Sequence, residues 1–236
     1  MSCEIKHGNN SEHDRKYKRQ AAHKIPGDVV NPMRRGHDAC FDYIPFAGAH
    51  LPRDVMAVSD TPTIGPDWPF AIYEALKAAD VRQLCYVPDA GHSRLIRLAH
   101  DDPAIATTVL TTEEEGIALS AGAWLGGQRA VLLMQSSGVG NCVNMLSLLA
   151  SCRFPFLTFV TMRGEWAEFN PWQVPMGKAT QAAFEIMGVT VFRLERAEDA
   201  GEIASAAAAL AFDSDQPIAV LISQRMIGAK KWTESK

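Results

Sequence analysis

The chain has 236 residues, long enough for one full α/β domain with a sizeable core but short for two domains. Hydrophobic residues at 47% and charged residues at 21% are ordinary for a globular protein. A net charge of −4 argues against a nucleic-acid binder. No apolar run approaches the ~20 residues of a membrane span, and five cysteines without CxxC spacing indicate reduced thiols, so we expect a cytoplasmic protein.

Residues 1–60 differ in composition from the rest of the chain. They contain basic clusters at Arg15–Arg19 and Met33–Arg35 and show little hydrophobic periodicity. We expect a disordered or irregular leader, or an extension upstream of a true start at Met56; a basic arm for an anionic partner is the alternative. Five histidines in this segment show no metal-ligand spacing: His7, His13, His23, His37 and His50.

From Pro66 the chain alternates between helical and extended patterns, within a domain expected to span residues 61–236. Helices are predicted at Trp68–Ala79, from the turn after Val87 through about Ala99, and at Glu113–Leu125, Asn141–Cys152, Lys178–Met187 and Ala197–Phe212. Apolar strands are predicted at Gln83–Val87, Ile105–Leu110, Ala130–Gln135, Phe156–Met162, Val189–Leu194 and Ile218–Ser223. Continuous apolar strands separated by helices predict an α/β fold, a doubly wound, mostly parallel six-stranded sheet covered on both faces.

The first predicted strand ends in a turn that contains two polar candidates, Asp89 and His92. Asp89 follows the strand directly, so it projects toward the carboxyl edge of the sheet, where ligands bind. The alternative for Asp89 is a turn residue that bonds its own backbone. His92 is either a proton carrier or a solvated turn histidine.

Three glutamates, Glu113 to Glu115, open the helix that follows the second strand. A carboxyl group among Ala, Leu and Gly at the carboxyl edge would be partly desolvated and suited to acid–base work. Alternatively, acids in a first helical turn complement the helix dipole, and all three would then lie on the surface.

The third strand runs into Gln135, Ser136 and a small-residue turn over Gly138–Asn141. Small residues let backbone N–H groups approach a ligand, and the following helix start favours anions. A tight strand-to-helix turn with Asn141 near the helix cap is an equally good interpretation.

A long segment after the fourth strand contains Arg163, Gln173 and Lys178. A guanidinium here is suited to bind a carboxylate, sulfonate or phosphonate in bidentate fashion, and loops of this length tend to be functional. Its aromatic residues offer an alternative role as an apolar subunit contact: Trp166, Phe169 and Trp172.

The motifs Glu114–Gly116, Ala121–Trp124 and Met134–Asn141 together resemble the pyrimidine-binding (PYR) domain of thiamine-diphosphate-dependent decarboxylases. Within this group the chain resembles the alpha subunit of sulfopyruvate decarboxylase and the amino-terminal half of phosphonopyruvate decarboxylase. The likeness runs from about Trp68 to about Lys231 and includes further short motifs: Val87-Pro88-Asp89, Arg163-Gly164 and Pro175-Met176-Gly177.

The resemblance implies a PYR-type domain in which Glu114 is the catalytic carboxyl group. Glu114 matches the glutamate that shares a proton with N1′ of the cofactor's aminopyrimidine and so promotes loss of the C2 proton. The resemblance also implies two sets of binding residues. Those beside the cofactor are Gln135, Ser136, Gly138 and Asn141. Those beside the substrate are Asp89, Gln135, Arg163, Gln173 and Lys178. His commonly precedes the Arg-Gly pair in these enzymes, whereas this chain has Met162.

The sequence lacks the Gly-Asp-Gly and later Asn-Asn motif with which these enzymes bind Mg²⁺ and the diphosphate. We therefore expect a diphosphate-binding (beta) partner chain that supplies the Mg²⁺ ligands, in a hetero-oligomer with shared active sites. The predicted function is the alpha subunit of a 2-oxo acid decarboxylase acting on a small anionic substrate such as 3-sulfopyruvate or phosphonopyruvate. The alternatives are a non-catalytic PYR-like subunit and an unrelated nucleotide-binding α/β module.

Overall fold

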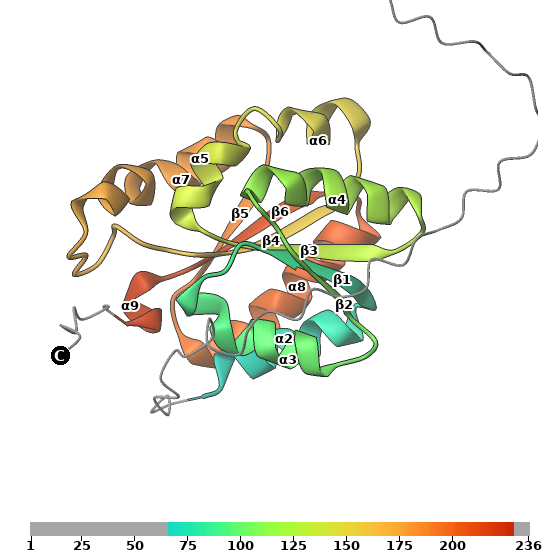
Figure 1. Ribbon diagram of the computed structural model, residues 1–236, viewed down its shortest axis with the longest axis horizontal. Coiled ribbons are helices and arrows are strands. Elements are labelled where there is room, and N and C mark those ends of the chain that lie inside the picture. The colour runs from blue at the N-terminus through green and yellow to red at the C-terminus, as the bar shows by residue number, and fades with distance from the viewer. Residues whose placement is uncertain (1–65, 229–236) are drawn as a thin grey trace, which may run out of the picture. The chain divides into compact units, whose positions relative to one another are not determined.

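A six-stranded parallel sheet forms the centre of the computed structural model, which describes residues 66–228 (Figure 1). The sheet has the order β2-β1-β3-β4-β6-β5, with all five strand pairs parallel. The strands are β1 (Val81–Tyr86), β2 (Ala106–Val109), β3 (Arg129–Gln135), β4 (Phe156–Thr161), β5 (Thr190–Leu194) and β6 (Pro217–Ile222). The predicted α/β class and strand number are confirmed. The predicted leader at 1–60 and both ends of the predicted domain lie outside the described residues.

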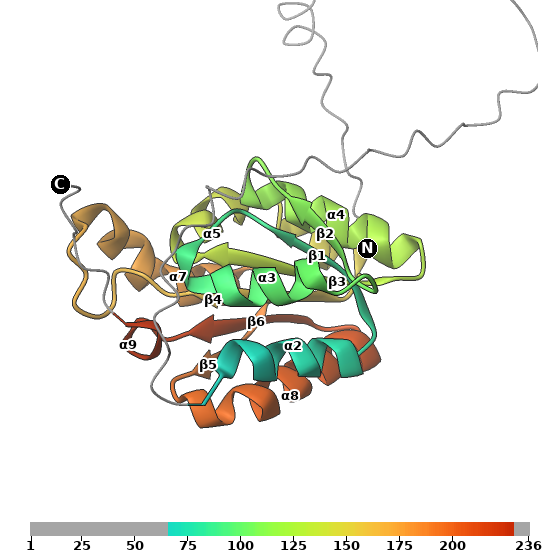
Figure 2. The same ribbon diagram turned by 60° about the horizontal axis from the view of Figure 1, so that its bottom comes forward.

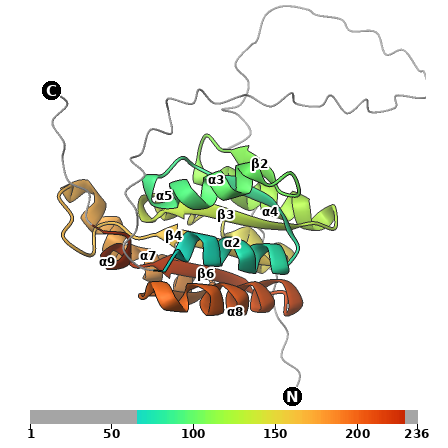
Figure 3. The same ribbon diagram turned by 90° about the horizontal axis from the view of Figure 1, so that it is seen from below.

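Helices cover both faces of the sheet. One face carries α2 (Trp68–Ala78), α3 (Ser93–Asp101) and α8 (Ala200–Asp213), as Figure 2 and Figure 3 show from two directions. The other face carries α4 (Glu113–Leu125), α5 (Ser136–Cys142), α6 (Ser147–Cys152) and α7 (Val174–Ile186). Right-handed crossovers explain the division, because connections that run in opposite directions along the sheet must lie on opposite faces.

Burial falls from the centre of the sheet to its edge. Every residue of β4 is buried, and β6 is buried from Ile218 onward. The prediction of a buried strand at Ile105–Leu110 was wrong in this respect, because β2 is an edge strand and Ala106–Val109 is mostly exposed. Only a strand with neighbours on both sides and helices on both faces loses contact with water throughout.

Two predicted helices were wrong in their bounds. The predicted helix at Asn141–Cys152 is instead two short helices, because the chain passes from Gln135 at the end of β3 straight into α5. Gly138–Asn141 is therefore helical rather than a turn, and Asn141 lies in the last turn of α5 rather than at a cap. The helix predicted at Lys178–Met187 begins one turn earlier, at Val174.

Three shorter helical segments complete the described chain: η2 (Ala90–His92), η3 (Pro171–Gln173) and η4 (Ala197–Asp199). A final short helix, α9 (Gln224–Ile227), follows β6, with the Ser223 hydroxyl accepting a hydrogen bond from the Arg225 N–H. No helix among the described residues combines the length and the apolar character needed to cross a membrane.

Candidate active site at the carboxyl edge of the sheet

The order in which strands are added to the sheet reverses between β1 and β3. From β1 the chain moves outward to β2, and β3 then returns to the opposite side of β1. In open α/β sheets, ligands bind in the crevice that such a reversal leaves outside the carboxyl ends of the strands. Asp89 follows β1 and Gln135 ends β3, so the crevice lies between two of the residues that the sequence singled out.

The three glutamates at the start of α4 have three different environments. Glu113 is buried, with 8% of its surface exposed, and its carboxylate accepts a hydrogen bond from the Asn141 amide at 2.9 Å. Glu115 is exposed and accepts a hydrogen bond from the Thr111 N–H at 2.9 Å. Glu114 is also exposed, and its carboxylate has no hydrogen bond with any residue in 66–228.

These environments decide between the two interpretations of the acidic run. The partly desolvated carboxyl group is that of Glu113, not of Glu114, so the expectation that all three acids lie on the surface was also wrong. Burial raises the pKa of the Cys142 thiol on α5 to about 12, and the charges of Glu113 and Glu114 add to this effect. Glu114 is thus left as the one glutamate of the run whose carboxylate no described side chain or backbone group engages.

Gly138 permits the close contact between α4 and α5. A Cβ atom at this position would overlap the Glu113 carboxyl group. Together with the bond from Asn141, this holds the first turn of α4 against α5. Gly138 and Asn141, which are expected beside a cofactor, both lie against Glu113. Because α5 begins at Ser136, the Gly-rich loop required by the nucleotide-binding alternative is absent from this segment.

Gln135 and Gln173 are brought together from separate parts of the sequence. The Gln135 amide donates to the Gln173 side-chain oxygen at 3.2 Å and to the Ser137 hydroxyl at 2.8 Å. Gln135 is half-buried at the carboxyl end of β3, and Gln173 ends η3 just before α7. The pair fits the predicted position of both residues at one edge of the sheet.

Ser136 makes hydrogen bonds with the backbone of Arg163. Its hydroxyl accepts from the Arg163 N–H at 3.0 Å and lies 3.3 Å from the Arg163 carbonyl. A Cβ atom on Gly177 would overlap that same carbonyl, so a glycine is required for α7 to approach the end of β4. Ser136 is fully buried, and its role in the described chain is to dock this loop.

The Arg163 guanidinium, expected to face an anionic substrate, binds Glu168 instead. Its Nε and Nη2 each donate to one oxygen of the Glu168 carboxylate at 2.6 Å. The two side chains are only 11% and 3% exposed. A bidentate pair of this kind orders the loop and occupies two of the five N–H groups of the guanidinium.

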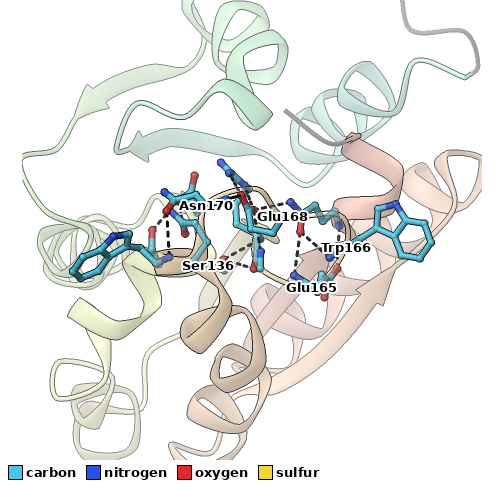
Figure 4. A network of polar contacts seen from close by, with 12 residues as sticks. Ser136, Glu165, Trp166, Glu168 and Asn170 are labelled. Atoms are coloured by element: carbon cyan, nitrogen blue, oxygen red, sulfur yellow. Dashed lines mark hydrogen bonds and ion pairs between the residues drawn. The ribbon is translucent and has the colours of Figure 1, made fainter. Parts of the chain in front are cut away.

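Gln224 and Glu168, which sequence reasoning missed, organise the same loop. Figure 4 shows the network, in which Glu168 lies between Ser136 and Glu165. The Gln224 amide donates to Glu168 at 2.8 Å, and its oxygen accepts from the backbone N–H groups of Glu165 and Trp166 at 3.1 and 2.9 Å. Gln224 is 59 residues from Glu165, so no local pattern marks it.

The network gives a testable pH dependence. The Arg163 guanidinium holds the pKa of Glu168 at about 2, below its ordinary value of 4.5, with backbone N–H groups and Gln224 assisting. A lowered pKa stabilises the fold above pH 4.5, and the contribution is lost as the pH falls from 4.5 toward 2. We expect wild type to unfold at higher urea concentration than Glu168→Gln at neutral pH, with the two curves converging in acid. An unchanged gap near pH 2 would contradict this.

Three aromatic side chains of this loop remain exposed. Trp166, Phe169 and Trp172 are 51%, 46% and 86% exposed. The Arg225 guanidinium lies over the Trp166 ring, 5.2 Å from the ring centre. The Arg163 guanidinium lies 5.8 Å from the centre of the Phe169 ring. The three side chains are therefore accessible, as the suggested subunit contact would require.

Asp89 behaves as the turn residue that the sequence allowed as an alternative. Its carboxylate accepts from the Gly91 N–H at 3.1 Å and from the Thr161 hydroxyl at 2.7 Å. His92 is neither solvated nor open to a ligand, because it is fully buried under the same turn. The interpretation of His92 as a solvated turn histidine was therefore wrong.

Lys178 lies exposed on α7, and no ion pair joins it to another residue of the described range. Within residues 66–228, no group of three or more potential metal-binding side chains lies together. A cavity of about 240 Å³ occurs at the opposite, amino-terminal edge of the sheet, lined by Trp124, Arg129 and Phe212 among others. It lies away from the candidate site.

Comparison with known proteins gives both sequence relatives and a structural relative. The sulfopyruvate decarboxylase alpha subunit of Methanocaldococcus jannaschii is 32% identical over 152 residues, which are 64% of this chain and 90% of that protein. The phosphonopyruvate decarboxylase of Streptomyces viridochromogenes is 37% identical over 107 residues, 44% of this chain and 27% of that protein. No protein-family model matches the chain.

A solved structure supports the fold. The 2-oxoglutarate:ferredoxin oxidoreductase of Magnetococcus marinus matches 68% of this chain and 29% of that chain, with a TM-score of 0.53 and 13% identity. At this identity the likeness concerns the fold alone.

Proposed function

The chain belongs to the family of sulfopyruvate decarboxylase alpha subunits, and from this premise we propose that it is the pyrimidine-binding subunit of a thiamine-diphosphate-dependent 2-oxo acid decarboxylase. The proposed domain spans residues 61–236. The observation that carries the proposal is the unengaged carboxylate of Glu114 at the carboxyl edge, on a helix whose first turn is fixed by Glu113 and Asn141.

The residues present fit one end of the cofactor. A carboxyl group without an internal partner is what an aminopyrimidine ring requires for a shared proton at N1′, and the half-buried Gln135 amide lies at the same edge. We expect Ser136, Gly138 and Asn141 to support these residues, since their side chains or close contacts serve Arg163 and Glu113. Thiamine diphosphate, when bound, supplies a nucleophilic carbon and an electron sink for loss of CO₂.

Glu114 would hold the proton at N1′, and the surrounding residues would orient the substrate. We propose a small 2-oxo acid with a second anionic group, such as 3-sulfopyruvate or phosphonopyruvate. Lys178 is the cation of the predicted set that no described carboxylate pairs with, whereas Arg163 is bound to Glu168. We therefore assign the distal anion to Lys178 and Gln173, and assign Arg163 to loop order.

A diphosphate-binding partner chain completes the proposal. The sequence contains no Gly-Asp-Gly motif with a following Asn-Asn pair, and hard oxygen ligands are what Mg²⁺ and a diphosphate require. We propose that a beta subunit supplies them, in a hetero-oligomer whose active sites lie between the two kinds of chain. Relatives that are themselves called alpha subunits support this arrangement.

The test is reconstitution. The purified chain with Mg²⁺ and thiamine diphosphate is expected to release no CO₂ from 3-sulfopyruvate or phosphonopyruvate and to bind the cofactor poorly by calorimetry. Addition of a chain that carries the diphosphate motif is expected to create activity. Robust decarboxylation by the single chain would overturn the two-chain proposal. A complex that forms and binds the cofactor but stays inactive on every 2-oxo acid would favour a structural or regulatory subunit.

A further inference from the structure

The turn between β1 and α3, residues 87–92, is tied to two strands across the crevice. The Thr161 hydroxyl on β4 donates to Asp89 at 2.7 Å. His92 Nε2 lies 3.2 Å from the carbonyl oxygen of Met134 on β3 and 3.1 Å from that of Phe159 on β4. These contacts join one turn to the ends of both neighbouring strands.

Gly91 allows the turn to lie this close. A Cβ atom at position 91 would stand 2.8 Å from the Thr161 methyl group and 2.8 Å from an Asp89 oxygen. Real Cβ atoms avoid such separations, so any other residue would push the turn away from β4. The turn is therefore shaped to bring the His92 ring over the strand carbonyls.

The surroundings of His92 determine where its proton lies. Both atoms that face Nε2 are carbonyl oxygens, which only accept hydrogen bonds, so Nε2 carries the proton and donates to them. Nδ1 is then an acceptor, and it is buried without a partner among the described residues. Burial lowers the pKa of His92, and the nearby Asp89 charge opposes this without overcoming it. A lowered pKa favours the neutral ring.

The two strand contacts bear directly on the candidate site. Met134 immediately precedes Gln135, and Phe159 is two residues before Thr161, which holds Asp89. An apolar ring would fill the same space without leaving a buried nitrogen unpaired, so the donor at Nε2 is the feature that distinguishes histidine here.

We infer that His92, as the neutral Nε2–H tautomer, is a positioning residue that fixes Asp89 and Gln135 relative to each other across the crevice. The effect of His92 on turnover rests on the proposed function. The effect of His92 on the relative placement of Asp89 and Gln135 is independent of that function.

The first measurement concerns the tautomer. In the full chain with ¹⁵N-labelled histidine, NMR is expected to show His92 with Nε2 protonated and Nδ1 unprotonated at about pH 6, where an ordinary histidine is mostly charged. Histidine signals are assigned by comparison with His92→Gln. A proton on Nδ1, alone or in addition to Nε2, would overturn the inference.

The second measurement compares two replacements. His92→Phe keeps a buried ring but has no donor, whereas His92→Gln keeps an N–H group at a similar reach and does not titrate. We expect His92→Phe to shift the backbone amide signals of Gln135–Ser137 and to lower kcat of the reconstituted complex about 10- to 100-fold, as expected for a small misplacement of site residues. His92→Gln is expected to restore both readouts. The matched control is His100→Gln, at an exposed histidine on α3, which should move neither.

The positioning role would be overturned if His92→Phe folds and the backbone amide signals of residues 135–137 stay at their wild-type positions. If His92→Phe does not fold, the test passes to His92→Gln, in which displaced Gln135 signals despite a retained donor would contradict it. A wild-type complex without decarboxylase activity would remove the proposed function, and the tautomer and amide signals would still decide the role of His92.

Discussion

Glu114→Gln is expected to slow exchange of the C2 proton of bound thiamine diphosphate about 10²–10⁴-fold, the usual loss when an acid–base group is removed. Glutamine keeps the shape of the side chain but cannot share a proton with N1′. Because Glu114 is exposed and makes no hydrogen bond within the described residues, the replacement should leave folding unchanged. The measurement is hydrogen–deuterium exchange at C2, followed by NMR in the complex with the partner chain.

Its neighbours provide matched controls. Glu115→Gln changes an exposed acid one residue away, whose helix-dipole contribution is roughly 0.3–1 kcal/mol, and it should leave the exchange rate near that of wild type. Glu113→Gln retains an oxygen that can accept from Asn141, so it should also leave the exchange rate near that of wild type. Wild-type exchange in Glu114→Gln would mean that another glutamate activates the cofactor, or that this chain does not.

Arg163→Ala is expected to lower the free energy of unfolding by about 3 kcal/mol, toward the lower end of the cost of breaking a buried ion pair. The cost stays at that end because Glu168 keeps other donors, from Gly164, Asn170 and Gln224. Since Arg163 is committed to Glu168, KM should change alike for a sulfonate-bearing substrate and for pyruvate. Urea unfolding and steady-state kinetics of the reconstituted complex measure the two effects.

Arg193→Ala is the control for this loop. Arg193 pairs with Glu165 at 3.0 Å, but the two side chains are 31% and 21% exposed, so the loss should be at most about 1 kcal/mol. If Arg163→Ala instead left stability intact and raised KM for the sulfonate alone, the guanidinium would bind the distal anion of the substrate, as the sequence first suggested.

The sequence by itself determined the α/β class, the six strands and the bounds of α4. These features depend on short-range patterns. Val131–Met134 is a continuous apolar run, and Phe156–Val160 is apolar except for Thr158; such runs are buried wherever helices cover both faces of a sheet. The helix Glu113–Leu125 combines acids in its first turn with Gly126 immediately after its end.

The early start of α5 had no such signal. Gln135, which precedes the helix, makes no capping hydrogen bond with its side chain, and two glycines follow within five residues. Packing decided this segment, because Gly138 must meet Glu113 and Gly140 must meet Met176. Local propensity is a weak guide where such tertiary contacts compete with it.

Only the tertiary structure decided which polar groups are free and which are engaged. The sequence gives Glu113 and Glu114 the same residue type and the same helical turn, yet one is buried against Asn141, 28 residues away, and the other is exposed. The partners of Gln224 and His92 lie 59 and 67 residues distant. A side chain's environment depends on which distant segment the fold brings beside it, and hydrophobic periodicity carries no information about that pairing.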